Sequence, residues 1–443
     1  MTIKPSLIQQ TENFIHQKTG KTLSFIQKIV LQESLNETPK TYVQIARENH
    51  YSEKYIRQHV APNLWKLISE VLGEKVNRTN CRAVLEQKIT NASIPKNQHL
   101  ATGLETLRSE SPEGQVPLNS PLYIERHNLE QTCYQEILKK AALIRIKAPC
   151  KMGKTSLLSR ILAYGKTQNW ATVRLSLNQV ETSRLASTNQ FLRWLCANVT
   201  QQLGLDSKLN EYWDEDVGTL VSCTLYFQEH ILNNLDSPLI FGLDEINQLF
   251  EHQSLSRDFL VLLRHWHEKG KDLAIWQKLR IILVHSTDIY IPIQANQSPF
   301  NIGVPIELPP FNQGEVEELA QRHGLKLTPS ELHQLMRLTG GYPYLVRLAF
   351  YHSLQHHLPL KELVANPVVY QAIFKPHLGY LSRKIKQNID LRESFKNILL
   401  SPAFLNEEIM FELKSLGLIT LDVNQVKVSC QLYQDYFTNY FNL

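Results

Sequence analysis

Residues 143–155 read LIRIKAPCKMGKT, and this stretch decides the fold class that the sequence predicts. The run LIRIK is rich in β-branched and apolar residues, and the loop after it ends in Gly153-Lys154-Thr155, where a helical pattern begins. Strand, tight loop and helix in this order are the context of a P-loop, whose backbone N–H groups and helix N-terminus surround phosphates. The stretch therefore predicts an α/β unit that binds a nucleotide.

The residues of this loop have separate expected roles. Lys154 is expected to reach the β- and γ-phosphates of ATP, and the Thr155 hydroxyl is expected to bind Mg²⁺. Gly153 allows close approach of the backbone, because it has no Cβ. The first position departs from the pattern GxxxxGK(S/T), since Ala148 replaces glycine, and alanine costs little there only if φ is negative. The expected phosphate-binding set is Ala148, Pro149, Cys150, Lys151, Met152, Gly153, Lys154, Thr155 and Ser156.

A second segment, LIFGLDE (239–245), supplies the other half of such a site. Gly-Lys-Thr alone is a common chance match, and an Asp-Glu pair after a buried strand is unremarkable by itself. Together, with one further strand between them in the chain, they predict an ATP site. Asp244 is expected to bind Mg²⁺ through water, and Glu245 is expected to orient and deprotonate the attacking water.

A third segment, IILVHST (281–287), predicts a strand that ends in polar residues. In P-loop ATPases with a catalytic glutamate, such a strand lies between the other two, and a polar residue at its end senses the γ-phosphate. Ser286 or Thr287 fits that role, although polar residues follow many strands. The strand-like runs alternate with helical segments, which is typical of a parallel α/β sheet. The expected strands are Leu143–Lys147, Ala171–Ser176, Leu239–Leu243, Arg280–His285 and Val304–Leu308.

The chain divides into regions of different pattern. We expect a small all-α helix-turn-helix domain at 1–90, a polar linker at 91–120, and a P-loop core of the additional-strand, catalytic-glutamate (ASCE) type, with a five-stranded parallel sheet, at 121–311. A helical lid is expected at 312–358. The last region, 359–443, is mostly helical, but two short β-like runs flank a turn at Asn424, which resembles the wing of a winged helix.

Composition and charge limit the function classes. The 443 residues are 43% hydrophobic, no apolar run approaches the roughly 18 residues of a membrane span, and no signal segment opens the chain, so we expect a cytoplasmic location. Six cysteines are scattered without a CxxC pair, which argues against disulfides or a structural zinc site. Residues 1–90 hold 13 Lys+Arg and 8 Asp+Glu, so the whole net charge of +5 lies there. An anionic partner is expected at that end.

Residues 41–61, TYVQIARENHYSEKYIRQHVA, indicate a helix, a short turn and a second helix that Ser52 can cap. Arg and Gln read base edges and Lys reaches phosphates, so the outer face of the second helix is a candidate DNA contact. A protein-binding module is the alternative interpretation. The residues expected inward are Tyr55, Ile56 and Val60, and the candidate DNA contacts are Lys54, Arg57 and Gln58.

With these segments placed, residues 121–443 resemble the AAA-like ATPases common in cyanobacteria, a branch near the STAND signalling ATPases. The resemblance rests on PLYIERHNLEQTCYQEI (121–137), IKAPCKMGKTSLLSR (146–160), FGLDEINQLFE (241–251), the block 262–311 and LTGGYPYLVRLAFYH (338–352). Residues 1–90 resemble the N-terminal helix-turn-helix domain of proteins associated with von Willebrand A–MoxR conflict systems.

The resemblance implies further contacts. Tyr123 and Arg126 would pack on the nucleotide base, and Pro343 of the Gly-Gly-Tyr-Pro element would touch adenine; a plain connection between two helices is the alternative for that element. Asp288-Ile289-Tyr290 stands where STAND ATPases often carry an arginine. Arg264 is the best substitute for a charge that reaches a neighbour's phosphate, although a salt bridge within its own helix is the simpler interpretation.

These features predict an ATP-dependent signalling switch with slow hydrolysis. It would use ATP and Mg²⁺, form homo-oligomers in the ATP state, and act through DNA, an effector or conflict-system proteins. One alternative is an oligomeric AAA+-like motor or DNA-loading ATPase with fast turnover. Another is a transcription regulator that binds nucleotide without hydrolysing it.

Overall fold

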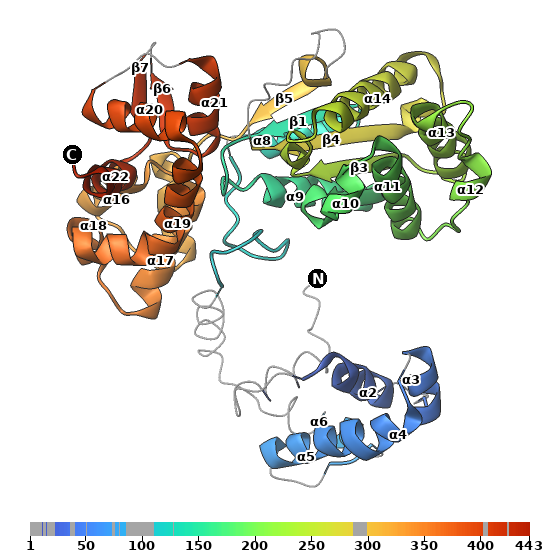
Figure 1. Ribbon diagram of the computed structural model, residues 1–443. Helices are drawn as coiled ribbons and strands as arrows, with labels where there is room; N and C mark the ends of the chain where they lie inside the picture. Colours follow the sequence, from blue (N-terminus) through green and yellow to red (C-terminus); the bar gives the residue numbers. More distant parts are fainter. Residues whose placement is uncertain are drawn as a thin grey trace. The chain divides into compact units, whose positions relative to one another are not determined.

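The computed structural model describes Thr11, Ile15, 23–35, 40–49, 51–72, 76–78, 80–85, 110–126, 128–286, 299–401, 406–422 and 425–443 (Figure 1). The chain divides into two units, Met1–Gly103 and Leu104–Leu443. In the part of the chain that is described, no helix is long and apolar enough to cross a membrane.

The N-terminal unit is helical. Its helices pack through a small core in which Val30, Ile45, Ile56 and Leu64 are fully buried. Thr41 caps α3 with a reciprocal capping box, and the Ser52 side chain accepts a hydrogen bond from the Tyr55 backbone, so the predicted cap at Ser52 is confirmed. The elements are α2 (Phe25–Leu35), α3 (Tyr42–Glu48), α4 (Glu53–Tyr55), η1 (Ile56–Val60), α5 (Ala61–Leu72) and α6 (Cys81–Leu85).

A five-stranded sheet in the order β2-β3-β4-β1-β5 forms the centre of the second unit, and every pair in it is parallel. The strand predicted from IILVHST (281–287) therefore lies between the strands predicted from LIRIK (143–147) and LIFGL (239–243), as expected. The strands match the predicted ranges to within one residue at each end. They are β1 (Leu143–Lys147), β2 (Ala171–Ser176), β3 (Leu239–Asp244), β4 (Leu279–His285) and β5 (Val304–Glu307).

Helices cover both faces of this sheet, because successive strand residues alternate between two apolar cores. Ile144 and Ile146 pack with α8 and α9, while Phe241 and Leu283 pack on the other face with α11 and α14. The elements are α8 (Leu129–Ile137), α9 (Lys154–Thr167), η3 (Leu177–Gln179), α10 (Thr182–Leu185), α11 (Thr188–Gln202), α12 (Leu209–Tyr212), α13 (Thr219–Leu225), η4 (Tyr226–Leu232), η5 (Ile246–Leu249), α14 (Gln253–Asp272), η6 (Trp276–Lys278) and η7 (Pro299–Asn301).

Helices follow the last strand of the sheet and form a group beside it, drawn in orange to red in Figure 1. A two-stranded antiparallel hairpin lies near the C-terminus, where the sequence predicts two β-like runs; Asn424 itself lies outside the described residues. The elements are α15 (Gln313–Arg322), α16 (Pro329–Thr339), α17 (Pro343–Gln355), α18 (Leu360–Ala365), α19 (Pro367–Gln387), α20 (Ile389–Leu400), α21 (Glu407–Ser415), β6 (Ile419–Asp422), β7 (Gln425–Val428) and α22 (Gln431–Phe441).

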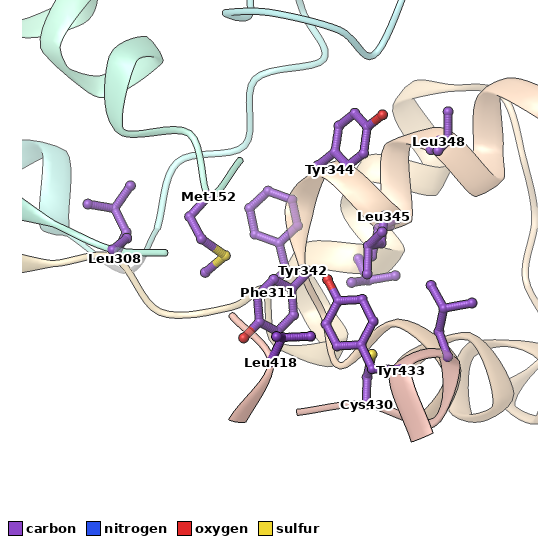
Figure 2. Packing of buried hydrophobic residues seen from close by; sticks show 14 of the residues in the cluster. Met152, Leu308, Phe311, Tyr342, Tyr344, Leu345, Leu348, Leu418, Cys430 and Tyr433 are labelled. Carbon is purple, nitrogen blue, oxygen red and sulfur yellow. The ribbon is translucent and has the colours of Figure 1, made fainter. Parts of the chain in front are cut away.

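One apolar core joins the sheet to this helical group. Met152 from the phosphate loop lies between Leu308, which follows β5, and the rings of Phe311 and Tyr342, and Leu418 lies beside those rings (Figure 2). The core continues from β1 through α17 and α19 to α22 without interruption. The sheet and the C-terminal helices are therefore one packed body, and the loop that follows β1 lies at the junction between them.

Candidate nucleotide-binding site

The loop between β1 and α9 has the backbone shape of a phosphate cradle. Two of its residues have positive φ, Lys151 (63°) and Gly153 (94°), whereas Ala148 does not. Alanine at the first position therefore meets no backbone strain. Gly153 is the N-cap of α9, so the partial positive end of that helix points into the loop. The Cys150 N–H donates to the carbonyl of Ser415 at 3.3 Å, which ties the loop to the end of α21.

Lys154 is held inside this loop. Its ammonium donates to the carbonyl oxygens of Ala148 and Pro149, both at 2.9 Å, and its side chain is 5% exposed. An ammonium has three donors, so one remains for a ligand. Burial lowers the pKa of Lys154, and the nearby Glu245 and Asp244 carboxylates oppose that shift. The loop therefore presents a positioned cation with one free donor.

The structure brings Thr155 and Asp244 together, although they belong to different strand ends. The Thr155 hydroxyl lies 3.1 Å from Asp244 Oδ2, and Asp244 is 2% exposed. An arginine that the sequence analysis missed completes the pair: Arg174, on β2, forms an ion pair with the same Asp244 oxygen at 2.8 Å. No motif identifies Arg174, because its contact depends on the pairing of β2 with β3.

The donor set at this point fits Mg²⁺. The Thr155 hydroxyl and the Asp244 carboxylate are oxygen ligands of the kind that Mg²⁺ prefers, and they converge beside the phosphate loop. Thr155 would bind the ion and Asp244 would hold its water shell, with Arg174 sharing the carboxylate. A cation there would neutralise phosphate charge.

Glu245 follows Asp244 in the left-handed conformation, with φ of 59°. A non-glycine residue in that region is strained, and such positions concentrate at functional sites. Within the described residues, the Glu245 carboxylate makes no hydrogen bond or ion pair. It lines a cavity of about 600 Å³ together with the phosphate loop. A carboxylate without a protein partner beside a phosphate cradle is available to accept a proton from water.

Two walls enclose this cavity. The sheet wall consists of residues from the carboxyl ends of β1, β2 and β3: Cys150, Lys151, Gly153, Lys154, Thr155, Ser156, Asn178, Glu245 and Gln248. The lid wall faces it and combines an irregular segment before α8 with α17, α19 and the end of α21: Pro112, Glu113, Gly114, Gln115, Val116, Pro343, Tyr344, Arg347, Pro376, His377, Tyr380, Leu381 and Leu416. Of the residues in the lid wall, only Pro343 was predicted from the sequence to contact the nucleotide.

Pro343 lies in this wall because the Gly-Gly-Tyr-Pro element ends one helix and begins the next. Gly340 caps α16 with φ of 61°, and Gly341 has φ of 72°. A Cβ on Gly341 would lie 2.2 Å from the Phe311 carbonyl oxygen, so only glycine fits there. Pro343 occupies the first turn of α17. The element is thus a helix connection whose proline also lines the cavity.

Arg126 and Tyr123 lie outside the set of residues that line the cavity. Arg126 is 3% exposed, donates to the Met152 carbonyl, and packs over the Phe311 ring at 4.9 Å. The Tyr123 hydroxyl donates to Glu130 at 2.6 Å. Arg126 thus contacts the phosphate loop through Met152, and both residues bond to Glu130, where the resemblance implies contacts to the base.

Ser286 donates to the Asn247 side chain at 3.2 Å and does not line the cavity, and Thr287 lies outside the described residues. Arg264 forms an ion pair with Glu268 at 2.9 Å, one turn along its own helix, which is the simpler of its two interpretations.

The candidate DNA contacts of the N-terminal unit, Lys54, Arg57 and Gln58, are all exposed. The expectation that Tyr55 points inward is wrong, because the ring is 45% exposed and stacks on Tyr51. Ile56, the next residue, is fully buried, and neighbouring residues on a helix point about 100° apart.

Family comparison agrees with this geometry. Residues 111–439 match the AAA-like domain family. The chain belongs to that family. Residues 1–88 match the N-terminal helix-turn-helix domain of vWA-MoxR associated proteins. No curated protein sequence matches the chain significantly.

The chain is also similar to solved structures. A Walker-type ATPase of Pyrococcus abyssi aligns with a TM-score of 0.50 and 13% identity, covering 74% of this chain and 99% of its own. The ORC2 protein of Aeropyrum pernix, in ADPNP–ADP complexes, aligns with a TM-score of 0.42 and 14% identity, covering 75% and 98%. At 13% identity the likeness to the Pyrococcus abyssi protein shows the fold alone, that of a Walker-type ATPase.

Proposed function

We propose that this chain is an ATP-dependent switch that binds ATP with Mg²⁺ and hydrolyses it slowly. The observation that carries the proposal is the convergence of Lys154, Thr155 and Glu245 around one cavity of about 600 Å³. That volume lies within the roughly 300–1,000 Å³ of typical ligand sites. Aromatic and proline side chains in the lid wall suit an adenine ring, and the loop suits phosphates.

The residues divide the expected work between them. Lys154 holds the β- and γ-phosphates with its remaining donor, and the loop N–H groups hold the others. Thr155 and Asp244 hold the cation, which neutralises charge as the phosphoryl group leaves. Glu245 orients water and accepts its proton. Slow turnover fits a lid wall that encloses the nucleotide, because product release then requires that wall to open.

Equilibrium binding of a fluorescent ATP analogue to the full chain tests this proposal. Lys154→Ala should weaken affinity by about 10- to 100-fold, since a charge-assisted hydrogen bond contributes roughly 1.5–3 kcal/mol. Lys139→Ala is a matched control, because Lys139 is exposed and, among the described residues, forms its ion pair with Glu136 near the end of α8. Wild-type affinity in the Lys154→Ala chain contradicts the proposed site.

Turnover distinguishes the switch from a motor. A motor requires fast hydrolysis stimulated by DNA and abolished by Glu245→Gln, whereas a switch shows slow hydrolysis that DNA leaves unchanged. A chain that binds ATP but releases no phosphate would be a regulator that uses nucleotide only for structure. Sizing with and without ATP, in the same preparation, tests the proposed self-association in the ATP state.

The N-terminal unit is the proposed output module, with DNA as its proposed partner. Lys54, Arg57 and Gln58 are exposed on one short stretch of helix, beside the stacked Tyr51 and Tyr55 rings. Binding of duplex DNA to the full chain should weaken steeply with salt, because released counterions drive phosphate contacts. Lys54→Ala/Arg57→Ala should reduce both affinity and salt dependence. Lack of DNA binding would favour a protein partner in regulation or defence.

A further inference from the structure

Residues 110–117, here named the strap, form part of the lid wall without belonging to a helix or strand. They fall within the stretch that the sequence predicts to be a linker, yet the strap contacts the sheet side, the helical group and the phosphate loop. In the chain, the strap comes directly after the segment that leads from the N-terminal unit.

The strap is fastened to the sheet side through α9 and β2. The Val116 N–H donates to the Ser156 hydroxyl at 2.9 Å, one residue beyond Thr155. Arg160 donates to the carbonyl oxygens of Val116 at 3.2 Å and Pro117 at 3.0 Å. The Gln115 side chain accepts from Arg174 at 2.7 Å, and Arg174 pairs with Asp244. A short hydrogen-bonded chain therefore runs from the strap to the cation-binding carboxylate.

The strap is also fastened to α17. Glu110 forms an ion pair with Arg347 at 2.8 Å, and these side chains are only 20% and 7% exposed. The Tyr344 hydroxyl donates to the Glu113 carboxylate. Removing either partner of a largely buried ion pair leaves a poorly solvated charge, so these contacts resist separation more than a surface pair does. The strap thus links α9 and β2 to α17 across the cavity.

Lys151 joins the phosphate loop to both of these partners. Its ammonium lies 3.4 Å from the Glu113 carboxylate and 3.6 Å from the centre of the Tyr344 ring. Lys151 has φ of 63°, a conformation that costs an L-residue roughly 1–2 kcal/mol. The loop therefore has a long cationic residue at a position where glycine would avoid the backbone strain. Compared with glycine, Lys151 provides the side chain that reaches the strap and α17.

We propose that the strap is a latch that closes over bound nucleotide. When the strap is closed, it fixes the position at which the chain that leads to the N-terminal unit leaves the site. This inference rests on the proposed nucleotide binding, and it adds a way in which nucleotide binding is coupled to the position of the strap. Nucleotide in the cavity contacts the sheet wall and the lid wall at once, and the strap spans the two. Opening the strap then requires the nucleotide to lose contacts, so occupancy and closure stabilise each other by the same free energy.

Amide hydrogen exchange of the full chain, with and without ATP and Mg²⁺, tests the latch. Peptides covering 110–117 should exchange slowly with ATP and faster without it. If opening releases the ligand, ATP at about 100 times its Kd should slow exchange about 100-fold. Amides of α14, which does not line the cavity, should not change where they exchange through local opening rather than through global unfolding. Equal exchange in both states, whether fast or slow, overturns the latch.

The charge-neutral variant Glu110→Gln/Glu113→Gln tests the fastening contacts. It should lose most of the ATP-dependent protection even at ATP concentrations that saturate the variant. Glu181→Gln is the matched control, because Glu181 is 74% exposed and, within the described ranges, its ion pair is with Arg184. Full protection in the double variant overturns the assigned contacts.

A direct measurement of bound ATP in the same samples separates the two proposals. If ATP does not bind, the proposed function fails and the latch fails with it. If ATP binds, Lys154→Ala weakens that binding as predicted, and the exchange of 110–117 is unchanged by ATP, the site stands and only the latch is overturned.

Discussion

The two walls of the cavity are built on different principles. The sheet wall places its charges at strand ends that a parallel sheet aligns. Lys154 in this wall is 5% exposed, and Asp244, which contacts Thr155 of the wall, is 2% exposed. The lid wall is built from segments that lie far apart in the chain, namely the strap, α17 and α19. Its members are held by ion pairs, aromatic rings and the apolar core that joins the helical group to the sheet.

This difference assigns phosphate binding and the chemical step to the sheet wall, and the regulation of binding to the lid wall. Buried charges on a rigid sheet are positioned before any ligand arrives, which suits phosphate and cation binding. Contacts between separate segments can form and break with occupancy, which suits a switch. Changes in the sheet wall should therefore alter phosphate binding, catalysis or folding stability, whereas changes at the strap and its partners should mainly alter ATP affinity and its coupling to closure.

The largest effect is expected at Glu245 in the sheet wall. Glu245→Gln keeps the size of the side chain but removes its proton-accepting charge, so phosphate release should fall by about 100-fold or more, the usual contribution of a general base. ATP affinity should change little, because Lys154 and Thr155 remain. Unchanged phosphate release would show that another group activates water.

The next effect concerns pH and the lid wall. Burial, followed by the positive charge of Lys151, lowers the pKa of His377 to about 4, with Glu113 opposing the shift. Below the ordinary value of about 6.5 the unfolded chain takes up a proton that the folded chain does not. The stabilisation is fully present above pH 6.5 and is lost as pH falls toward 4, by up to about 3 kcal/mol.

Urea unfolding of the full chain between pH 7.5 and 5 measures this slope. His377→Gln should flatten it in part, because burial also lowers the pKa of His323 to about 4 and that residue remains. A slope that is the same in the variant and the wild type would contradict the assignment to His377.

A smaller effect is expected for Arg174. Arg174→Gln leaves Asp244 with Thr155 alone and should cost about 2 kcal/mol of unfolding free energy, below the roughly 3–5 kcal/mol of a fully buried pair because Arg174 is 30% exposed. Denaturation without nucleotide measures the loss. Arg184→Gln, which breaks an exposed pair with Glu181, should cost less than about 1 kcal/mol. Equal losses in the two variants would count against a special role of Arg174.

The smallest effect is expected at Tyr344 in the lid wall. Tyr344→Phe removes the hydrogen bond to Glu113 but keeps the ring beneath Lys151, so ATP affinity should fall about 2- to 10-fold, corresponding to roughly 0.5–1.5 kcal/mol. Tyr351→Phe, on the same helix, is the control, since Tyr351 does not line the cavity. If Tyr344→Phe lowered ATP affinity more than Tyr344→Ala, which removes the ring as well, the separate contributions assigned to the ring and the hydroxyl would be refuted.

The sheet wall could be predicted from the sequence, and the physical reason is local. Buried parallel strands are short apolar runs, so their ends are visible, and a parallel sheet brings those ends to one edge. Lys154, Thr155, Asp244 and Glu245 were found in this way. Ala148 was an open question that only the backbone angles could answer.

The lid wall could not be predicted in the same way. The pairs Glu110–Arg347 and Glu113–Tyr344 join residues more than 200 positions apart, and no local pattern encodes such contacts. Proline, glycine and serine gave the strap the composition of a linker. The prediction that Tyr55 points inward is wrong for a related reason. Its ring is apolar enough for the core, but the helix turns Ile56, and not Tyr55, toward the core.

The uninterrupted apolar core from β1 to α22 has a consequence for how the second unit can be divided. A chain cut after Leu308 would leave Met152 and Leu308 without the side chains of the helical group that pack beside them in Figure 2. The exposed apolar surface would favour aggregation over a soluble fragment. The sheet and the C-terminal helices should unfold in one cooperative transition, so the phosphate loop cannot be studied as an isolated module.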